Sequence, residues 1–333
     1  MGAPHGRLIY VSLGGEPRLA VVELADDGAL VARSDMDLAL PAATGAMALG
    51  RDSRRLYLEM RPDRLATVAL DADGRPALVG ITEDVGSPAY LSVARGESIL
   101  VCAHFGSAEL VTHDVSGEPP HRELARVAAA VEPHAALVDP SDRRVYVPHR
   151  NGMTTDWFDL ADDGSLARQG GLPSQAGDGP RHIVVSPDGA IAWVINEFAS
   201  SVSAHRRAAD GSLERFQTVS TLPEAAGDGA GDGKNICADV HVTPDGRFLY
   251  GSNRGHNSLA MFAVASDGSL QPLGTVPAPA FPREFDVSPD GRFVVAGGQH
   301  DGNLESYRVA EDGRLESVGS LHVGDDPRWV FIE

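Results

Sequence analysis

The sequence predicts an all-β protein, a seven-bladed β-propeller built from four-stranded antiparallel blades. Three observations carry this prediction. The 333 residues include 37 glycines and 22 prolines spread along the chain, which is typical of short strands joined by tight turns. An Asp-Gly turn phrase recurs along the chain, and a Pro-Asp-Gly hairpin phrase alternates with it. Since no linker or low-complexity segment interrupts the repeats, we expect residues 1–333 to form a single domain.

The first phrase is an alternating apolar segment followed by an acidic residue, a glycine and a leucine. Its copies are ADDGAL (25–30), ADGRPAL (72–78), a degenerate VSGEPP (115–120), ADDGSL (161–166), AADGSL (208–213), ASDGSL (265–270) and AEDGRL (310–315). Their glycines, at 28, 74, 117, 164, 211, 268 and 313, lie 43 to 57 residues apart. That period is typical of propeller blades.

The second phrase is a strand, a tight turn and another strand. Clear copies are SPDGAIAWVIN (186–196), TPDGRFLYGSN (243–253) and SPDGRFVVAGG (288–298), with looser ones at 49–59, 93–103 and 139–149. Proline presets φ, aspartate caps the turn and glycine adopts positive φ, which together favour a hairpin. Each repeat therefore holds two hairpins, enough for one four-stranded blade.

The two ends of the chain supply the missing blade. Seven Asp-Gly turns accompany only six copies of the second phrase. DPRWVFIE (326–333) resembles a first strand without a successor, and RLIYVSL (7–13) a second strand without a predecessor. We expect these segments to pair, because the pairing leaves no sheet edge open.

Composition narrows the possible partners and the compartment. A net charge of -19 argues against nucleic acid and anionic membranes, which bind cationic surfaces. The sequence offers neither a signal-like start nor a run of membrane-spanning length. Cys102 and Cys237 are too few for a disulfide framework and lack metal-binding spacing, so we expect reduced core residues. We predict a cytoplasmic protein, a monomer or weak homo-oligomer.

In a propeller, the loop before each first strand and the loop after each second strand lie at the same mouth of the central channel. Polar residues gather in both loops. The first set is His134, Arg181, His182, Asp239 (with His241 farther along), Arg283, Glu284 and Arg328; the second is His104, His149, Arg150, Asn196, Glu197, Asn253, Arg254, Gln299 and His300. His134, Arg181 and Arg283 each lie six residues before a turn proline, at 140, 187 and 289.

Such residue types are costly in a dry centre, so the two sets predict a polar pocket with cationic groups for an anionic or polyhydroxylated small molecule. A purely structural role, such as an ion pair between Arg181 and Glu197, is the alternative for any single member. Lys234 and Asn235, in the insertion GAGDGKN (229–235), either touch the ligand or belong to a surface loop. Five other histidines are predicted at the surface: His5, His113, His121, His205 and His322.

The phrases GPRHIVVSPDG, ADVHVTPDGRFLYGSNR and PREFDVSPDGRFVVAGGQ resemble those of the seven-bladed propeller lactonases. This family has a bacterial 6-phosphogluconolactonase type and includes the 3-carboxy-cis,cis-muconate lactonising enzyme. The resemblance covers essentially the whole chain. It implies a hydrolase of carbohydrate metabolism in which His134, Arg181, Glu197 and Arg283 are the catalytic and substrate-binding groups.

Lactone hydrolysis requires an activated water, stabilisation of an oxyanion and protonation of the leaving ring oxygen. Glu197 or His134 is the candidate base, and Arg181 and Arg283 are candidates to stabilise the oxyanion or clamp an anionic group. His149 or His182 could donate the proton. The substrate is expected to be a sugar-derived lactone, and neither a cofactor nor a metal is predicted.

Three alternatives stay open. The same pocket could lactonise a muconate-like diacid. A non-catalytic propeller could bind a protein partner, with Phe105 and Trp329 as its few aromatic anchors. A divalent cation could be bound by Glu197, Asn196 and Asp239, although the resemblance is to the metal-independent branch of these lactonases.

Overall fold

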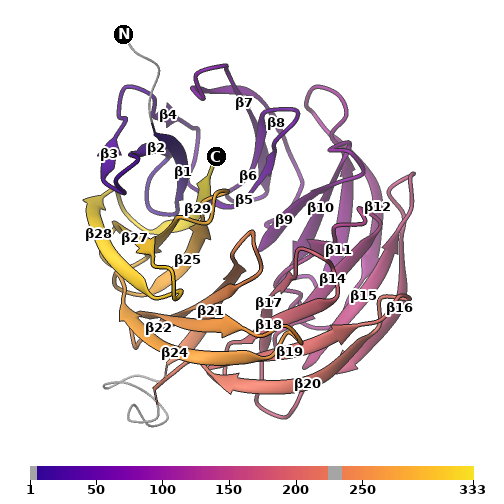
Figure 1. Cartoon of the computed structure of the whole chain (residues 1–333). Coiled ribbons are helices and arrows are strands. Elements are labelled where there is room, and N and C mark those ends of the chain that lie inside the picture. Colours follow the sequence, from indigo (N-terminus) through magenta and orange to yellow (C-terminus); the bar gives the residue numbers. More distant parts are fainter. Residues whose placement is uncertain (1–5, 224–234) are drawn as a thin grey trace. The chain divides into compact units, whose positions relative to one another are not determined.

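The computed structural model describes residues 6–223 and 235–333 as β-strands joined by turns (Figure 1). Within these ranges no helix is long and apolar enough to cross a membrane. The strands form seven antiparallel sheets, the number that the repeats predict. Contacts divide the chain into two compact units, residues 1–44, 200–202 and 219–333 (unit 1) and residues 45–199 and 203–218 (unit 2).

Unit 2 contains four sheets, and in each of them the strands follow one another in sequence order. The sheets consist of β5 (Thr44–Gly50), β6 (Arg55–Met60), β7 (Arg64–Leu70) and β8 (Pro76–Thr82); β9 (Tyr90–Ala94), β10 (Ile99–His104), β11 (Glu109–Asp114) and β12 (Arg122–Ala128); β13 (Leu137–Val138), β14 (Arg144–His149), β15 (Thr154–Leu160) and β16 (Leu166–Pro173); and β17 (Pro180–Val185), β18 (Ile191–Asn196), β19 (Ser201–Arg207) and β20 (Leu213–Ser220).

Unit 1 contains three sheets. Two follow sequence order: β21 (Ile236–Val242), β22 (Phe248–Arg254), β23 (Ser258–Val264) and β24 (Leu270–Pro277); and β25 (Pro282–Val287), β26 (Phe293–Gly298), β27 (Asn303–Val309) and β28 (Leu315–His322). The third combines the chain ends in the order β29 (Pro327–Ile332), β1 (Arg7–Leu13), β2 (Arg18–Leu24) and β3 (Leu30–Ala32), with β4 (Leu38–Ala39) also paired to β2.

The predicted closure by the C-terminal strand is confirmed. Strand β29 pairs antiparallel with β1, with Ile332 opposite Ile9 and Val330 opposite Val11. In Figure 1 the yellow β29 lies beside the indigo β1. Residues 327–332 therefore complete a sheet whose other strands belong to the first 39 residues.

The Pro-Asp-Gly turns join the first and second strands of their sheets, as predicted. Between β17 and β18, the Ser186 hydroxyl donates to the Asp188 carboxylate over 2.6 Å, and the same carboxylate accepts the Ala190 amide over 3.0 Å. Gly189 has φ +74°, a conformation that glycine adopts without strain. These contacts are local, so the turn phrase alone favours the hairpin.

The hydrophobic cores lie between neighbouring sheets of a unit. One core joins Ile99, Val101 and Leu110 of one unit 2 sheet to Val145 and Phe158 of the next. Second and third strands are consequently covered on both faces, and β10 is buried along its whole length. The predicted burial of Cys102 and Cys237 is confirmed, and both are free thiols.

Three histidines that were predicted at the surface are buried, two of them because of this double covering. His113 and His205 lie on the third strands β11 and β19 and are 3% and 2% exposed, and His121 is 6% exposed. The Nε2 atom of His121 lies 2.8 Å from the Thr67 hydroxyl of another sheet. His322 is exposed as predicted, whereas His5 lies outside the described residues.

Candidate functional site

Three of the predicted arginines are the extra residues of β-bulges near the start of a first strand. Register shifts by one residue at Arg181 in β17 and at Arg283 in β25, and between β29 and β1 the unmatched residue is Arg328. A bulge takes its residue out of the ladder and redirects the side chain, which is why bulges recur beside functional sites. The sequence shows the equivalent spacing of Arg181 and Arg283, but it does not show the bulge.

In unit 2 the hairpin of β17 and β18 brings Arg181 and Glu197 together, as the sequence predicted. The Glu197 amide donates to the Gly179 carbonyl over 2.7 Å, which places Glu197 beside the start of β17. Its Oε2 lies 3.4 Å from the Arg181 Nε. Glu197 is 3% exposed and Arg181 is 0% exposed, so this is a buried ion pair. Such a pair is stable only if each of its charges has close partners.

Arg150 adds a second guanidinium to Glu197. Its Nη1 donates to Glu197 Oε1 over 3.0 Å, and its Nε donates to Glu132 over 2.9 Å. Burial acts to lower the pKa of Arg150, but the two carboxylates outweigh it and raise that pKa. The guanidinium lies 4.8 Å from the ring centroid of Phe105 and 5.5 Å from that of Phe198, so cation-π contacts help to hold it.

His182 and His134 extend the cluster from the other side of Arg181. Arg181 Nη1 lies 3.2 Å from His182 Nε2. Because a guanidinium can only donate, this contact is a hydrogen bond when Nε2 accepts and the imidazole proton is on Nδ1. The His134 ring meets the His182 ring edge-on with centroids 5.3 Å apart. Both histidines are buried, at 5% and 3% exposure, beside a fixed cation.

His149 and Asn196 are directed into their own sheets. The His149 Nδ1 lies 3.1 Å from the Ala130 carbonyl, and its Nε2 lies 3.6 Å from Asp156. Burial is the main cause that lowers the pKa of His149 to about 4, against the opposing charge of Asp156. The Asn196 amide donates to the Ser203 hydroxyl over 3.3 Å. These contacts favour a structural role for both side chains.

In unit 1, Asp239 and His241 belong to a cluster with a third member, Asp286, that the sequence did not reveal. The His241 Nε2 lies 2.9 Å from Asp239 Oδ2, and its Nδ1 lies 3.7 Å from Asp286 Oδ1. Burial acts to lower the pKa of His241, but Asp239, Asp286 and Glu284 together raise it to about 9. The sequence signal for the pair of Asp239 and His241 was their spacing of two positions, since alternate residues of a strand share a face.

Both aspartates of this group also connect neighbouring first strands. Asp239, on β21, accepts the Phe285 amide of β25 over 3.3 Å. Asp286, on β25, accepts the Ile332 amide of β29 over 2.8 Å. Their carboxylates are thus occupied by backbone donors and by His241.

The other predicted residues of unit 1 have mainly structural contacts. Asn253 accepts the Thr221 hydroxyl over 2.7 Å and the Asn235 amide over 3.0 Å, and Asn235 is 3% exposed. Lys234 lies outside the described residues.

The remaining predicted residues of unit 1 are either held against the Phe281 ring or partly exposed. Arg254 donates to the Cys237 carbonyl over 2.8 Å, and its guanidinium lies 5.3 Å from the Phe281 ring. His300 stacks on that ring at 4.1 Å and is exposed. The partly exposed members are Gln299, Arg283 and Arg328, of which Arg328 pairs with Asp326 over 2.8 Å.

The hydrogen-bond and ion-pair partners of the carboxylates bear on whether these residues could bind a metal ion. Glu197 is bonded by Arg150 and paired with Arg181, and Asp239 by His241 and two backbone amides. Cationic and N–H donors thus occupy the carboxylate oxygens that a divalent cation would need. These contacts count against the cation site that the sequence offered at Glu197, Asn196 and Asp239, and a metal-independent reaction stays a prediction.

Comparison with known proteins identifies the family. A model of the family described as "Lactonase, 7-bladed beta-propeller" matches residues 20–332. The 6-phosphogluconolactonase of Pectobacterium carotovorum subsp. carotovorum (strain PC1) is 30% identical over 291 residues, covering 84% of this chain and 84% of that protein. That of Yersinia pestis (strain Pestoides F) is 30% identical over 288 residues, covering 84% and 83%.

Solved structures agree on the fold. The periplasmic gluconolactonase of Pseudomonas aeruginosa is similar with a TM-score of 0.87 at 21% identity, covering 98% of both chains. A protein from Lactobacillus plantarum has a TM-score of 0.86 at 23% identity, covering 98% of this chain and 99% of that one. With the family match spanning nearly all of the sequence, the chain belongs to the seven-bladed β-propeller lactonase family.

Proposed function

We propose that this protein hydrolyses a sugar-derived lactone of the 6-phosphogluconolactone type. One observation carries the proposal: a buried carboxylate, Glu197, lies between two guanidinium groups, and one of these, Arg181, contacts His182 of a pair of buried histidines. The curated relatives named 6-phosphogluconolactonase support the reaction class.

The groups around Glu197 suit the three tasks of lactone hydrolysis. Glu197 or His134 accepts the proton of the attacking water. Arg181, which is fully buried, stabilises the negative charge that develops on the carbonyl oxygen, an effect that is strongest where water is excluded. In the tautomer that accepts from Arg181, His182 carries its proton on Nδ1 and can donate from that atom to the leaving ring oxygen.

The cations of the site suit a substrate with a phosphate or carboxylate group. Arg150 is partly exposed and can turn one N–H toward an anion while its contacts with Glu132 and Glu197 hold it in place. The family resemblance adds Arg283 as a second anion-binding group. The proposal includes no cofactor and no metal. It also includes a single cytoplasmic domain over residues 1–333 and a pocket of the kind that the family has at the channel mouth.

A lactone panel tests the proposal. Purified protein is supplied with 6-phosphogluconolactone, gluconolactone and a carboxymuconate, and proton release and lactone formation are followed. Hydrolysis of the phosphorylated lactone is expected, unchanged by a chelator. Activity only toward the carboxymuconate would indicate a lactonising enzyme instead of a hydrolase. Inactivity toward all three compounds would contradict the proposal.

Two variants assign the base. Glu197→Gln removes the carboxylate and His134→Ala removes the imidazole; the variant that lacks the base should lose at least about a hundredfold in kcat, because a general base contributes roughly 10²- to 10⁴-fold. His322→Ala, at an exposed histidine, is the matched control and should be fully active. Circular dichroism verifies folding, and full activity in both site variants would contradict the assignment.

A further inference from the structure

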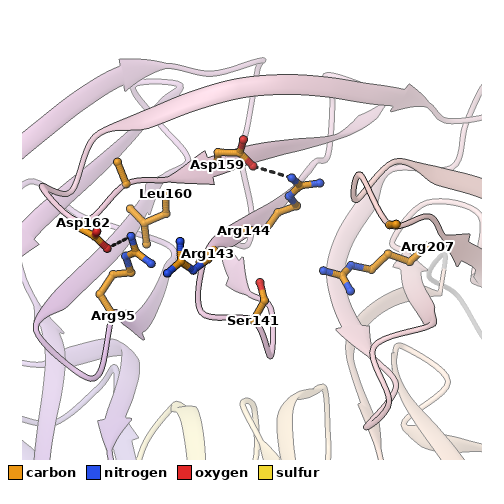
Figure 2. Close-up of a pocket in the computed structure, with 10 residues that line it drawn as sticks. Arg95, Ser141, Arg143, Arg144, Asp159, Leu160, Asp162 and Arg207 are labelled. Atoms are coloured by element: carbon orange, nitrogen blue, oxygen red, sulfur yellow. Dashed lines mark hydrogen bonds and ion pairs between the residues drawn. The ribbon is translucent and has the colours of Figure 1, made fainter.

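A cleft of about 720 Å³ lies in unit 2 at the strand ends opposite the Glu197 cluster (Figure 2). Strand β14 shows the separation, since Arg144 at its start lines the cleft and His149 ends it next to Arg150. Nothing in the proposed lactonase chemistry uses this cleft. Its charged lining consists of Arg95, Arg143, Arg144, Arg207, Asp159 and Asp162.

Two of the arginines are fixed at the walls by carboxylates. Arg95 pairs with Asp162, and Arg144 Nη2 donates to Asp159 over 2.7 Å. Arg144 also packs on Gly211, whose backbone has φ +80° and where a Cβ would overlap the guanidinium. Their positions are therefore set before any ligand arrives.

Arg207 is fixed from behind by three groups. Its Nε donates to the Tyr146 hydroxyl over 2.7 Å and its Nη1 to the Gly189 carbonyl over 2.9 Å. Its Nη2 pairs with Asp139, whose side chain is fully buried. A guanidinium with this many fixed acceptors loses little further freedom when it binds an anion.

Arg143 differs from the other three. It is exposed, and among the described residues no hydrogen bond or ion pair holds its guanidinium. Figure 2 shows it between Arg95 and Arg144, with Arg207 directed toward it from the far side. The lining side chains comprise four arginines and two aspartates, and Asp139 is paired with Arg207 behind them, which leaves an excess of one positive charge in a chain of net charge -19.

We propose that this cleft binds a small phosphate monoester. A phosphate monoester carries close to two negative charges at neutral pH, opposite in sign to the excess, and its oxygens accept hydrogen bonds from several guanidinium groups at once. The volume exceeds that of phosphate alone and lies in the range of small-molecule sites. Leu160 and Ala161 give the organic part of the ligand an apolar wall.

The test uses inorganic phosphate as the probe and isothermal titration at constant ionic strength as the measurement. Titrations are made in an Arg150→Gln background, which weakens anion binding near Glu197. Saturable binding with one site is expected there. Arg143→Gln added to this background should weaken it roughly tenfold or more, the usual effect of losing a charge-assisted hydrogen bond.

Arg206→Gln is the matched control, because Arg206 precedes Arg207 on β19 but is exposed and stacks over Phe216 at 4.3 Å. It removes the same charge and should leave phosphate affinity unchanged. Equal losses in both variants would mean only general charge attraction, and binding abolished by Arg150→Gln alone would place phosphate at the Glu197 cluster; either result overturns the inference. Since binding is measured without a lactone, failure of the proposed hydrolysis would leave this result standing.

Discussion

The buried imidazole of His205 makes a quantitative prediction about acid stability. His205 is 2% exposed, and its Nδ1 has no hydrogen-bond partner among the described residues. Burial, aided by the nearby charge of Arg215, lowers its pKa to about 4 although two backbone carbonyls act in the other direction. An imidazole in the unfolded chain has a pKa of about 6.5.

The direction in which stability changes with pH depends on whether the folded or the unfolded state binds the proton. Above pH 6.5 both states are neutral and His205 contributes nothing to the pH dependence. As pH falls below 6.5 the unfolded chain binds a proton that the folded chain does not, so folding stability decreases until the pH passes the folded value. At pH 5 the difference amounts to about 2 kcal/mol, from a shift of about 2.5 units at 1.36 kcal/mol per unit applied over that part of the range.

Urea unfolding at pH 7.5 and pH 5.0, followed by circular dichroism, measures this difference. His205→Gln removes the titrating group, so its free energy of unfolding should fall by about 2 kcal/mol less between the two pH values than that of the unmodified protein. His322→Gln, at an exposed position, should keep the original pH dependence. If His205→Gln and the unmodified protein lost the same free energy, the account of a neutral buried imidazole would be refuted.

Two further predictions concern the sheets of unit 1. A chain ending at Asp325 lacks β29 and leaves β1 without its partner, so thermal unfolding by calorimetry should lose cooperativity and shift to lower temperature; an unchanged transition would contradict closure by β29. His241→Gln should destabilise the protein more at pH 6 than at pH 9.5, because a raised folded pKa gives stability that is complete below about 6.5 and lost as pH passes about 9. The effect should stay well under the full shift because the His241 side chain is about a third exposed, and equal destabilisation at both pH values would count against a charged imidazole.

The repeats predicted the fold because turn chemistry is local. A Pro-Asp-Gly turn specifies its hairpin within six residues, and the count of Asp-Gly turns sets the number of sheets. The pair of Arg181 and Glu197 could be foreseen for the same reason, since one hairpin joins them. The burial of His205 could not be foreseen, because it depends on how neighbouring sheets cover a third strand.

The cleft lined by arginines also escaped prediction, for a related reason. Arg95 lies on a turn, Arg144 begins β14 and Arg207 ends β19, and the three are far apart in sequence. Their convergence depends on how neighbouring sheets of unit 2 pack, and no local pattern encodes it. Likewise, His241 stood beside Asp239 in the sequence, but only the structure shows the second carboxylate, Asp286, at its other nitrogen.

The pairing of β29 with β1 has a consequence for biosynthesis. Strand β1 is synthesised more than 300 residues before its partner, Pro327–Ile332. At roughly 5–20 residues per second, the nascent chain carries an open edge on β1 for roughly a quarter of a minute to a minute. During that time the edge can pair with a neighbouring nascent chain on the same message. Slow translation should therefore favour aggregation of this protein.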